Sequence, residues 1–396
     1  ASTSNVIKSG DINKFHELET IGEFPELGIV KSTEKELWTE TLKAFNLENK
    51  KIASLGTNFG KEVAALIDFG LPKENITVID KSGFPDVWNA AGVNVIETSI
   101  EEVEMNFKPD VTIANPPYVG KAQLHQKFFN KAVEMTKDGG VVIFLQPATP
   151  YQNQKQPRKH EAKMMENVLE YKTDVKILDS NIFKGADIGN DLAVTVLHKV
   201  KNTSGKLNSI TYKDGNKYEN VSLEDISMTG ISPDVFSKIK SKYENYTTNN
   251  GSLQDKTYYK LNSPKNNIAG LPKIRGHMGS SDMYTFQPTD VSNTKYYTTD
   301  ISKKHDFGIE VKNNKEIRNV YSYLTTYVAR FGLAILKNNP NNHMGEFAKV
   351  PLVDFNKKWT DEMLIKELKL TEKEMKVIIN TVGNYHGWLA TYQRIN

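Results

Sequence analysis

Segments typical of β-strands and of α-helices alternate through the first 200 residues. Short runs rich in Val, Ile and Leu are followed by amphipathic stretches of helical length, several of which end at glycine. This alternation predicts a mostly parallel sheet with helices on both faces. Two final strands with no helix between them predict an antiparallel hairpin at one edge. Strands are expected at 50–56, 76–80, 93–98, 110–115, 141–147, 175–180 and 192–200, and helices at 61–70, 86–92, 124–140 and 161–171.

The pattern changes after residue 203, where segments become short and irregular. We therefore expect two domains, an α/β domain over 1–203 and an α+β domain with a short helical tail over 204–396. In the second, a single long helix is expected at 315–336 and two short helices within 364–382. Residues 241–267 have the composition of a loop.

Charge and tyrosine are unevenly distributed between the two halves. Residues 1–200 contain 23 Lys and Arg against 28 Asp and Glu, a net charge of −5, whereas residues 201–396 contain 28 against 20, a net charge of +8. Fourteen of the 17 tyrosines follow residue 200. Cations that meet phosphates and flat rings that meet bases favour a nucleic-acid partner for the second half, although a Lys-rich solvated surface has the same composition.

Several classes of site are excluded by composition. The chain contains no cysteine, so it has no disulfides, thiolate metal sites or cysteine nucleophile. Its histidines lack metal-ligand spacing, and no metal is expected. The longest aliphatic run, at 141–145, is far shorter than the roughly 20 residues of a membrane span. The first ten residues do not resemble a signal peptide, so a cytoplasmic location with no membrane partner is expected.

The loop after the first strand has the composition of a ligand-binding turn. Gly56 and Gly60 flank it, and a helix begins at residue 61. Glycines allow a ligand to approach the backbone, and a helix N-terminus favours an anion. Asp80 ends the next strand, where a carboxylate can accept hydrogen bonds from ribose hydroxyls. The same residues could form only a tight turn and a surface acid; as a binding loop, they suit a dinucleotide or S-adenosylmethionine.

The sequence Asn115-Pro116-Pro117-Tyr118 directly follows the fourth strand. Two prolines make the loop rigid and remove two backbone donors. The side-chain carbonyl of Asn115 and the main-chain carbonyl of Pro116 then provide two acceptors for a planar NH2 group. The ring of Tyr118 provides a flat face for stacking on the base that carries this group.

These motifs resemble those of class I S-adenosylmethionine-dependent methyltransferases that act on amino groups. The NPPY motif is similar to the signature of N6-adenine DNA methyltransferases. The order of cofactor loop, NPPY and additional domain resembles the gamma type, which includes Eco57I-like enzymes. The resemblance covers residues 28–200 motif by motif; residues 273–286 and 345–378 more loosely resemble the target-recognition region and C-terminal segment of such enzymes.

The resemblance implies a set of residues that bind S-adenosylmethionine. Thr33 matches a position near the methionine carboxylate, Asp80 matches the ribose ligand, and Thr98 and Ser99 match the positions near the cofactor's adenine. The glycine loop departs from the family pattern at two places, because Ser54 replaces an acidic residue and Asn58 replaces a glycine. Ser99 likewise stands where an Asp is usual. The implied cofactor set is Thr33, Ser54, Gly56, Asn58, Gly60, Asp80, Thr98 and Ser99.

The resemblance also implies catalysis by Asn115, Pro116, Pro117 and Tyr118 on an adenine flipped out of duplex DNA. Phe183 matches an aromatic residue that packs on the flipped base, and Lys273 and Arg275 lie in the segment similar to a target-recognition loop. The implied reaction is direct methyl transfer to adenine N6 in a bacterial or phage-infected cell. A monomer is compatible with this interpretation, and a cognate restriction enzyme is left open.

Three alternatives remain open from the sequence. Related motifs occur in RNA base methyltransferases, which could also use a basic, Tyr-rich second half. They occur too in enzymes that methylate glutamine side chains, which have no use for such a half. Finally, the altered glycine loop would suit a nucleic-acid-binding subunit without catalysis, although the intact NPPY favours an enzyme.

Overall fold

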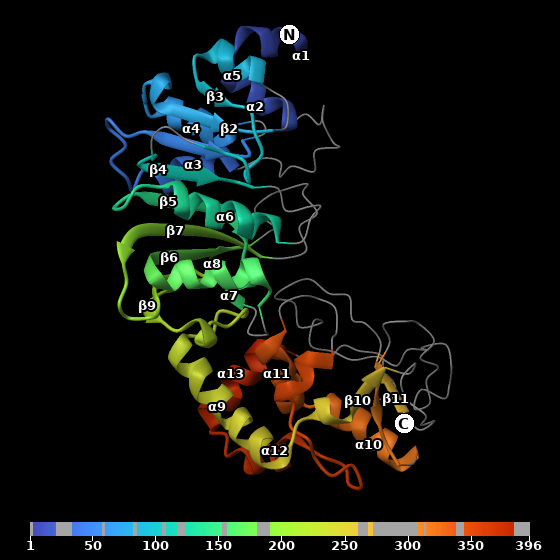
Figure 1. Cartoon of the computed structure of the whole chain (residues 1–396). Helices are drawn as coiled ribbons and strands as arrows, with labels where there is room; N and C mark the ends of the chain where they lie inside the picture. The colour runs from blue at the N-terminus through green and yellow to red at the C-terminus, as the bar shows by residue number, and fades with distance from the viewer. Residues whose placement is uncertain are drawn as a thin grey trace. The chain divides into compact units, whose positions relative to one another are not determined.

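The structure is a computed structural model of the 396-residue chain. It describes residues 3–20, 34–57, 60–81, 85–104, 108–116, 123–152, 157–179, 191–259, 268–271, 307–312, 314–337 and 344–383. The chain divides into two compact units (Figure 1). The first contains residues 1–150 and 156–223, and the second contains residues 151–155 and 224–396.

The first unit contains a nine-stranded sheet and most of the helices of the first half. Its strands are β1 (Ile52–Leu55), β2 (Ile76–Ile79), β3 (Asn94–Ile96), β4 (Val111–Ala114), β5 (Val141–Pro147), β6 (Tyr171–Leu178), β7 (Leu192–Lys201), β8 (Leu207–Thr211) and β9 (Lys217–Val221). Its helices are α1 (Thr3–Ser9), α2 (Ile12–Thr20), α3 (Glu34–Leu42), α4 (Lys61–Asp68), η2 (Lys73–Asn75), α5 (Pro85–Ala91), α6 (Leu124–Met135) and α8 (Lys159–Glu170), and the short α7 (Thr149–Gln152) continues across the division.

The strands follow the order β3-β2-β1-β4-β5-β7-β6-β8-β9. Strands β1 to β5 are parallel, and β7 pairs antiparallel with both β5 and β6. This arrangement confirms the predicted Rossmann-like α/β sheet, mostly parallel, with an antiparallel pair after the last helix. The pair was expected at one edge of the sheet, but β8 and β9 follow β6 and form that edge instead.

Helices cover both faces of the sheet, as the alternation predicted. Along β5, Ile143 and Leu145 belong to one apolar cluster, which also contains Trp38 of α3 and Val63 of α4. Because successive side chains of a strand point to opposite faces, Phe144 points the other way. It contacts Phe129 of α6 edge to face, with ring centroids 5.2 Å apart. Helices α6 and α8 contact each other beside that face (Figure 1).

The division between the units lies later than the expected boundary at residue 203. Strand β8 pairs in parallel with β6, and β9 pairs antiparallel with β8, so residues 207–221 extend the first sheet. The unit therefore continues to Leu223. The change of pattern after residue 203 reflects a hairpin at the edge of the sheet, because short strands joined by a turn also read as irregular sequence.

The second unit is α+β, as predicted, and has its own apolar core. A small antiparallel sheet has the order β10-β12-β11, with β12 between its neighbours. The helices and strands of the second unit are η4 (Leu223–Asp225) at the division, α9 (Pro233–Asn250), η5 (Leu253–Lys256), β10 (Thr257–Tyr259), β11 (Ile268–Leu271), β12 (Phe307–Glu310), α10 (Asn314–Leu324), α11 (Tyr327–Leu336), η8 (Met344–Lys349), α12 (Asp361–Leu368) and α13 (Glu372–Val382).

Helix α9, with η5 and β10 after it, corrects the expectation that residues 241–259 form a loop; the rest of that segment, 260–267, lies outside the described residues. Phe236, Ile239 and Tyr243 are buried on one side of it, at the spacing of a helical face. The helix begins with Pro233 at its first position and ends before Gly251, whose φ is 90°. The Asn-rich end of this segment resembles a loop in composition, but its aromatic and aliphatic residues keep the helical period.

The helix expected at 315–336 is two helices. Helix α10 ends at Leu324, and α11 begins at Tyr327. The hydroxyl of Thr326 accepts a hydrogen bond from the Ala329 N–H at 3.2 Å, and the Asp361 carboxylate accepts from the N–H groups of Tyr327 and Val328. These bonds satisfy donors that a continuous helix would bond within itself, so the chain starts a new helix there. The two short helices expected in the tail are confirmed by α12 and α13.

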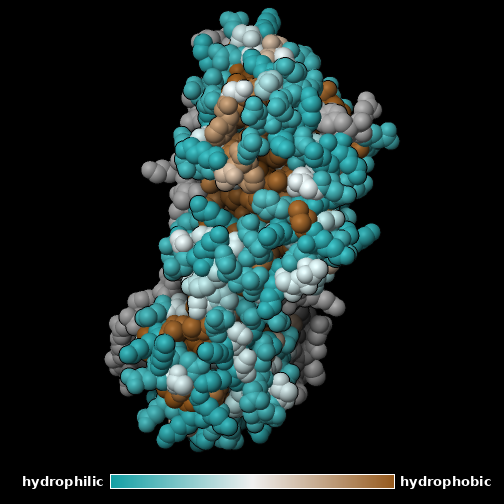
Figure 2. Space-filling view, turned by 90° about the vertical axis from the view of Figure 1, so that its left-hand side faces the viewer, coloured by the Kyte–Doolittle hydropathy of each residue, from teal (hydrophilic) through white to brown (hydrophobic). Residues whose placement is uncertain are grey.

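The face of the molecule in Figure 2 is mainly hydrophilic, with hydrophobic patches between the polar areas. Among the described residues, the exposed large apolar side chains are Phe69, Val200 and Ile379. None of the described helices combines the length and the apolar composition needed to cross a membrane.

Candidate functional site

The predicted catalytic and cofactor residues follow neighbouring strands at one edge of the sheet. The strand registers align Leu55 of β1 with Ile79 of β2 and with Ala114 of β4. Gly56, Asp80 and Asn115 therefore follow these three strands at the same level. The strand order reverses between β1 and β4, and open α/β sheets bind ligands in the crevice at such a reversal, outside the carboxyl ends of the strands. The structure thus brings Gly56, Asp80 and Asn115 together at the carboxyl ends of these strands.

The two glycines of the loop after β1 both have left-handed backbone conformations. Gly56 has a φ of 61°, and its N–H donates to the Ile79 carbonyl at 2.8 Å. Gly60 has a φ of 70° and directly precedes α4. A Cβ atom at Gly60 would lie 2.1 Å from the ring of Trp88, which is buried in the core. Packing against Trp88 is therefore sufficient to require glycine at position 60, whatever binds on the other side.

Ser54, where the family pattern has an acid, belongs to a buried polar cluster. Its hydroxyl donates to Glu62 Oε1 at 2.9 Å and lies 2.8 Å from the Thr57 hydroxyl. Ser54 is completely buried, so it supports the shape of the loop from behind rather than contacting a ligand directly. Burial, together with the charge of Glu34, raises the pKa of the Glu62 carboxyl to about 8.

Asn115 is held from behind by Glu34, the first residue of α3. Asn115 Nδ2 donates to Glu34 Oε1 at 2.9 Å, and Trp38 Nε1 donates to the same oxygen at 3.0 Å. Burial raises the pKa of the Glu34 carboxyl above its usual value, and the charge of Lys61 and these two hydrogen bonds offset this effect only in part. Glu34 and Glu62 are both buried acids, and Glu34 has the nearby lysine and accepts from two side chains. If one proton is shared between them, we therefore assign the carboxylate to Glu34 and the proton to Glu62. Pro116, next to Asn115, is buried.

The remaining described cofactor candidates follow β2 and β3. Asp80 is half-buried, and its N–H donates to the Ile96 carbonyl at 3.2 Å. Thr98 and Ser99 are half-buried and lie in the turn after β3, where the Ser99 carbonyl accepts from the Glu102 N–H at 3.1 Å. Because β3 pairs with β2, this turn lies beside Asp80 at the same edge. The predicted residues Thr33, Asn58, Pro117, Tyr118, Phe183, Lys273 and Arg275 lie outside the described residues.

Three residues of this site were missed by sequence reasoning: Glu34, Lys61 and Glu62. All three are almost completely buried, which is rare for charged side chains unless they are paired. In the sequence they resemble ordinary acidic and basic residues in the first turn of a helix. No local signal distinguishes them, because their burial depends on α3 and α4 packing together beside the sheet.

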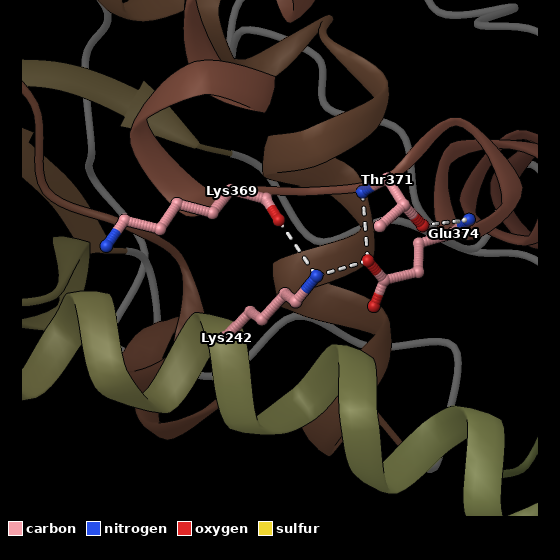
Figure 3. A network of polar contacts seen from close by, with 4 residues as sticks. All are labelled: Lys242, Lys369, Thr371 and Glu374. Atoms are coloured by element: carbon pink, nitrogen blue, oxygen red, sulfur yellow. Dashed lines mark hydrogen bonds and ion pairs between the residues drawn. The ribbon is translucent and has the colours of Figure 1, made fainter.

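The second unit contains a separate polar network between α9 and the turn that joins α12 to α13 (Figure 3). Lys242 of α9 donates to the Lys369 carbonyl at 2.8 Å and forms an ion pair with Glu374. Glu374 and Thr371 exchange two hydrogen bonds in a capping box that starts α13. A groove of about 640 Å³ lies here, and its charged lining residues are Lys238, Lys242, Lys369, Lys373 and Glu374.

A second hollow, of about 650 Å³, lies between α6 and α8. Its lining includes Lys127, Asn130 and His160 but none of the residues predicted for the cofactor or for catalysis. Within the described part of the chain, no group of three or more His, Asp or Glu side chains is arranged to hold a metal ion.

No protein-family model and no curated protein sequence matches this chain. Among solved structures, it is similar to a proposed class I S-adenosylmethionine-dependent methyltransferase from Listeria monocytogenes, with 14% identity over 59% of this chain and 79% of the other, at a TM-score of 0.38. It is also similar to TrmN from Thermus thermophilus, with 15% identity over 45% of this chain and 52% of the other, at a TM-score of 0.34.

A third similar structure is the methyltransferase subunit of a type I restriction-modification system from Streptococcus thermophilus, with 13% identity over 46% of this chain and 47% of the other, at a TM-score of 0.36. The chain spans about half the length of the Thermus and Streptococcus proteins. Likenesses this distant carry no information about substrate or activity, which must be argued from the site itself.

Proposed function

We propose that this chain is a methyltransferase that uses S-adenosylmethionine to methylate the N6 amino group of adenine in duplex DNA. The observation that carries the proposal is the position of Asn115, which follows β4 directly beside the β1 loop at the reversal of strand order. Its amide nitrogen is bonded to Glu34, so the carbonyl end of the amide is the end that faces away from Glu34. A hydrogen-bond acceptor at this edge is what an incoming amino group requires.

The residues present fit the proposed cofactor. Gly56 has no side chain and a left-handed conformation at the end of β1, so a ligand can approach the main chain closely. Asp80 places a carboxylate at the end of β2, where ribose hydroxyls can donate to it. Thr98 and Ser99 would contact the adenine of the cofactor, and Thr33 and Asn58 its amino-acid end. Ser54 and Gly60 would act by shaping the loop, because their own surroundings are protein atoms.

In the proposed reaction, bound S-adenosylmethionine supplies a methyl group on a positively charged sulfur. The Asn115 Oδ1 and Pro116 carbonyl oxygens would accept the two hydrogens of the target amine and turn its lone pair toward that methyl group. A carbon–nitrogen bond forms as the carbon–sulfur bond breaks, and the methylated amine then releases one proton to water. The chain contributes orientation and hydrogen-bond acceptors, which lower the barrier without a covalent intermediate.

The target adenine would have to leave the duplex to reach Asn115. We propose that Tyr118 and Phe183 hold the flipped base, and that the second unit, with Lys273 and Arg275, grips the phosphates and reads the sequence. The net charge of +8 over residues 201–396 supports this role. A cognate restriction enzyme is compatible with this proposal but is not required by it.

The proposal is tested by offering the protein labelled S-adenosylmethionine with duplex DNA, RNA and protein substrates in parallel. We expect label in duplex DNA, and digestion to nucleosides should place it on N6 of adenine. Asn115→Ala is the control for contaminating activity. Label in RNA or in glutamine side chains would replace the DNA assignment with one of those alternatives, and no transfer to any substrate would favour a binding subunit.

A further inference from the structure

The side-chain amide of Asn115 has two ends, and only one of them points to Glu34. We propose that Glu34 is a positioning residue that determines which end of the Asn115 amide faces the substrate. This inference rests on the function proposed above and adds to it a residue outside the NPPY motif.

Glu34 is itself held in place from two sides. It lies in the first turn of α3 and is 3% exposed. Its Oε1 atom accepts from Trp38 Nε1 one turn later in the same helix and from Asn115 Nδ2, which is 81 residues away in the chain. Trp38 is 2% exposed, so its indole cannot move aside without disturbing the core. The carboxylate therefore occupies one place, and Asn115 meets it there.

An asparagine amide can turn over, because its oxygen and its NH2 group have nearly the same shape. A carboxylate accepts hydrogen bonds and donates none. A turned amide would put the Asn115 oxygen against the Glu34 oxygen, so that two acceptors would face each other. Glu34 thus selects the orientation in which NH2 is behind and Oδ1 is in front. An amide turned the other way would present a donor to the substrate amine and could not hold its hydrogens.

Two nearby titratable side chains, Lys61 and Glu62, help to keep Glu34 an acceptor. Lys61 is buried and close enough for its positive charge to favour the Glu34 carboxylate. Glu62 is the other buried acid of the cluster, and it is hydrogen-bonded to Ser54 instead. With the proton on Glu62, the pair carries one negative charge opposite one lysine, which is a less costly arrangement in a buried site than two carboxylates.

Two conservative substitutions of Glu34 separate the effect of its side-chain length from the effect of its charge. Glu34→Gln keeps the length of the side chain and an acceptor oxygen but loses the charge. Glu34→Asp keeps the charge beside Lys61 but is one methylene shorter, so it cannot reach Asn115 from the same backbone position. We expect the Gln variant to retain kcat within about threefold and the Asp variant to lose at least about tenfold, with cofactor affinity nearly unchanged in both.

Equal kcat values for the two variants, or a faster Asp variant, would overturn the proposal, because either result means that charge or general stability matters more than reach. Asn167→Ala is the matched control. It removes a buried side-chain hydrogen bond between α8 and α6, to Asn130 Oδ1 at 3.0 Å, and touches none of the residues around Glu34. It should therefore lower Tm while kcat per folded molecule is kept. The double variant Glu34→Asp, Asn115→Ala should be no slower than Asn115→Ala alone.

A readout that does not need activity keeps this inference separate from the proposed function. In protein labelled with ¹⁵N-asparagine, the Asn115 side-chain amide signal should shift toward solvent-like values in the Asp variant and stay near its wild-type position in the Gln variant. An unchanged signal in the Asp variant would sink the inference even if the wild type is an active methyltransferase. A wild type that transfers no methyl group but shows the expected shift would sink only the proposed function.

Discussion

At the scale of single residues, substitution of Asn115 is the most direct test of the proposed mechanism. Asn115→Ala removes an acceptor that the proposed reaction needs in the transition state, so we expect kcat to fall by about 10²-fold or more, as for the loss of one preorganised polar contact in other enzymes. Cofactor binding should survive. Asn130→Ala is the control, because Asn130 is bonded to the His160 carbonyl away from the predicted site. Activity within about threefold of wild type would remove Asn115 from the mechanism.

Asp80 should act on cofactor affinity rather than on the chemical step. If its carboxylate accepts from the ribose, Asp80→Ala should weaken S-adenosylmethionine binding by about 1.5–3 kcal/mol, the usual range for hydrogen bonds to a charged group. Calorimetry measures this directly. Asp86→Ala, at an exposed acid in the first turn of α5, is the control and should bind normally. Equal affinity of the Asp80 and Asp86 variants would mean that the cofactor lies elsewhere.

Glu62 should leave a signature in the pH dependence of stability. Its folded pKa is about 8, against an ordinary value of 4.5, because burial and the charge of Glu34 oppose its ionisation and outweigh the opposite effect of Lys61. The folded state therefore holds more protons than the unfolded state. The stability that Glu62 contributes is fully present below about pH 4.5 and is lost as pH rises through about 8.

Glu62→Gln should remove this fall in the free energy of unfolding with rising pH, because glutamine stays neutral at every pH. Relative to wild type, the variant should gain stability between pH 5 and pH 9, by at most about 5 kcal/mol from the size of the pKa shift. Urea titrations across that range give the difference. Parallel pH profiles for the two proteins would show that Glu62 ionises in the folded state as easily as in the unfolded state.

At this scale, the sequence predicts site residues that lie within one short segment or at the end of one element. Asn115 and Pro116 could be proposed as site residues because the motif is four consecutive residues after a strand. Gly56, Gly60 and Asp80 could be proposed because each follows or precedes an element whose end is visible in the sequence. Glu34 could not, since its link to Asn115 spans 81 residues and exists only once α3 has packed against the sheet. The reason for Gly60, which is contact with Trp88, was hidden in the same way.

At the scale of elements, the break between α10 and α11 depends on the hydroxyl of Thr326. Helix α11 is apolar on most sides, with eight buried residues, so its position determines much of the second core. Thr326→Ala should destabilise the protein by about 1 kcal/mol, the typical cost of losing an N-cap. Thr326→Ser keeps the hydroxyl and is the control. If urea unfolding shows equal losses for both variants, the effect comes from the methyl group and its packing.

Helices and strands were predicted correctly where one local sequence pattern dominated. The predictions failed where two patterns competed. The strands of the parallel sheet were visible because they are short, and because most of them are buried and separated by helices. Residues 315–336 read as one helix because apolar residues continue through Thr325 and Thr326, and the carboxylate that ends this continuity, Asp361, comes from α12. Helix α9 was missed because the asparagines at its end outweighed the period of its buried residues.

At the scale of the whole molecule, we expect strong salt dependence of DNA binding. Each phosphate neutralised contributes a slope of about −0.9 to the plot of log affinity against log salt. Changing both Lys273 and Arg275 to Glu should lower the magnitude of this slope by about 2 if each meets a phosphate. The exposed pair Lys43 and Lys163, changed in the same way, is the control of equal charge. Equal slopes for the two double variants would place the DNA-binding surface elsewhere.

Strands β8 and β9, the last two of the large sheet, determine where the chain can be truncated to give a stable fragment of the first unit. A fragment that stops at residue 203 would lose β8 and β9 and leave one side of the eight-residue strand β6 without its neighbour. Such an open row of N–H and C=O groups is a template on which a second molecule can add its own strand. A fragment ending at residue 223 keeps β9 as its border, and β9 carries the exposed charges of Lys217 and Glu219, which discourage that addition. The shorter fragment should therefore aggregate as it is concentrated, while the longer one should elute as a single monodisperse species.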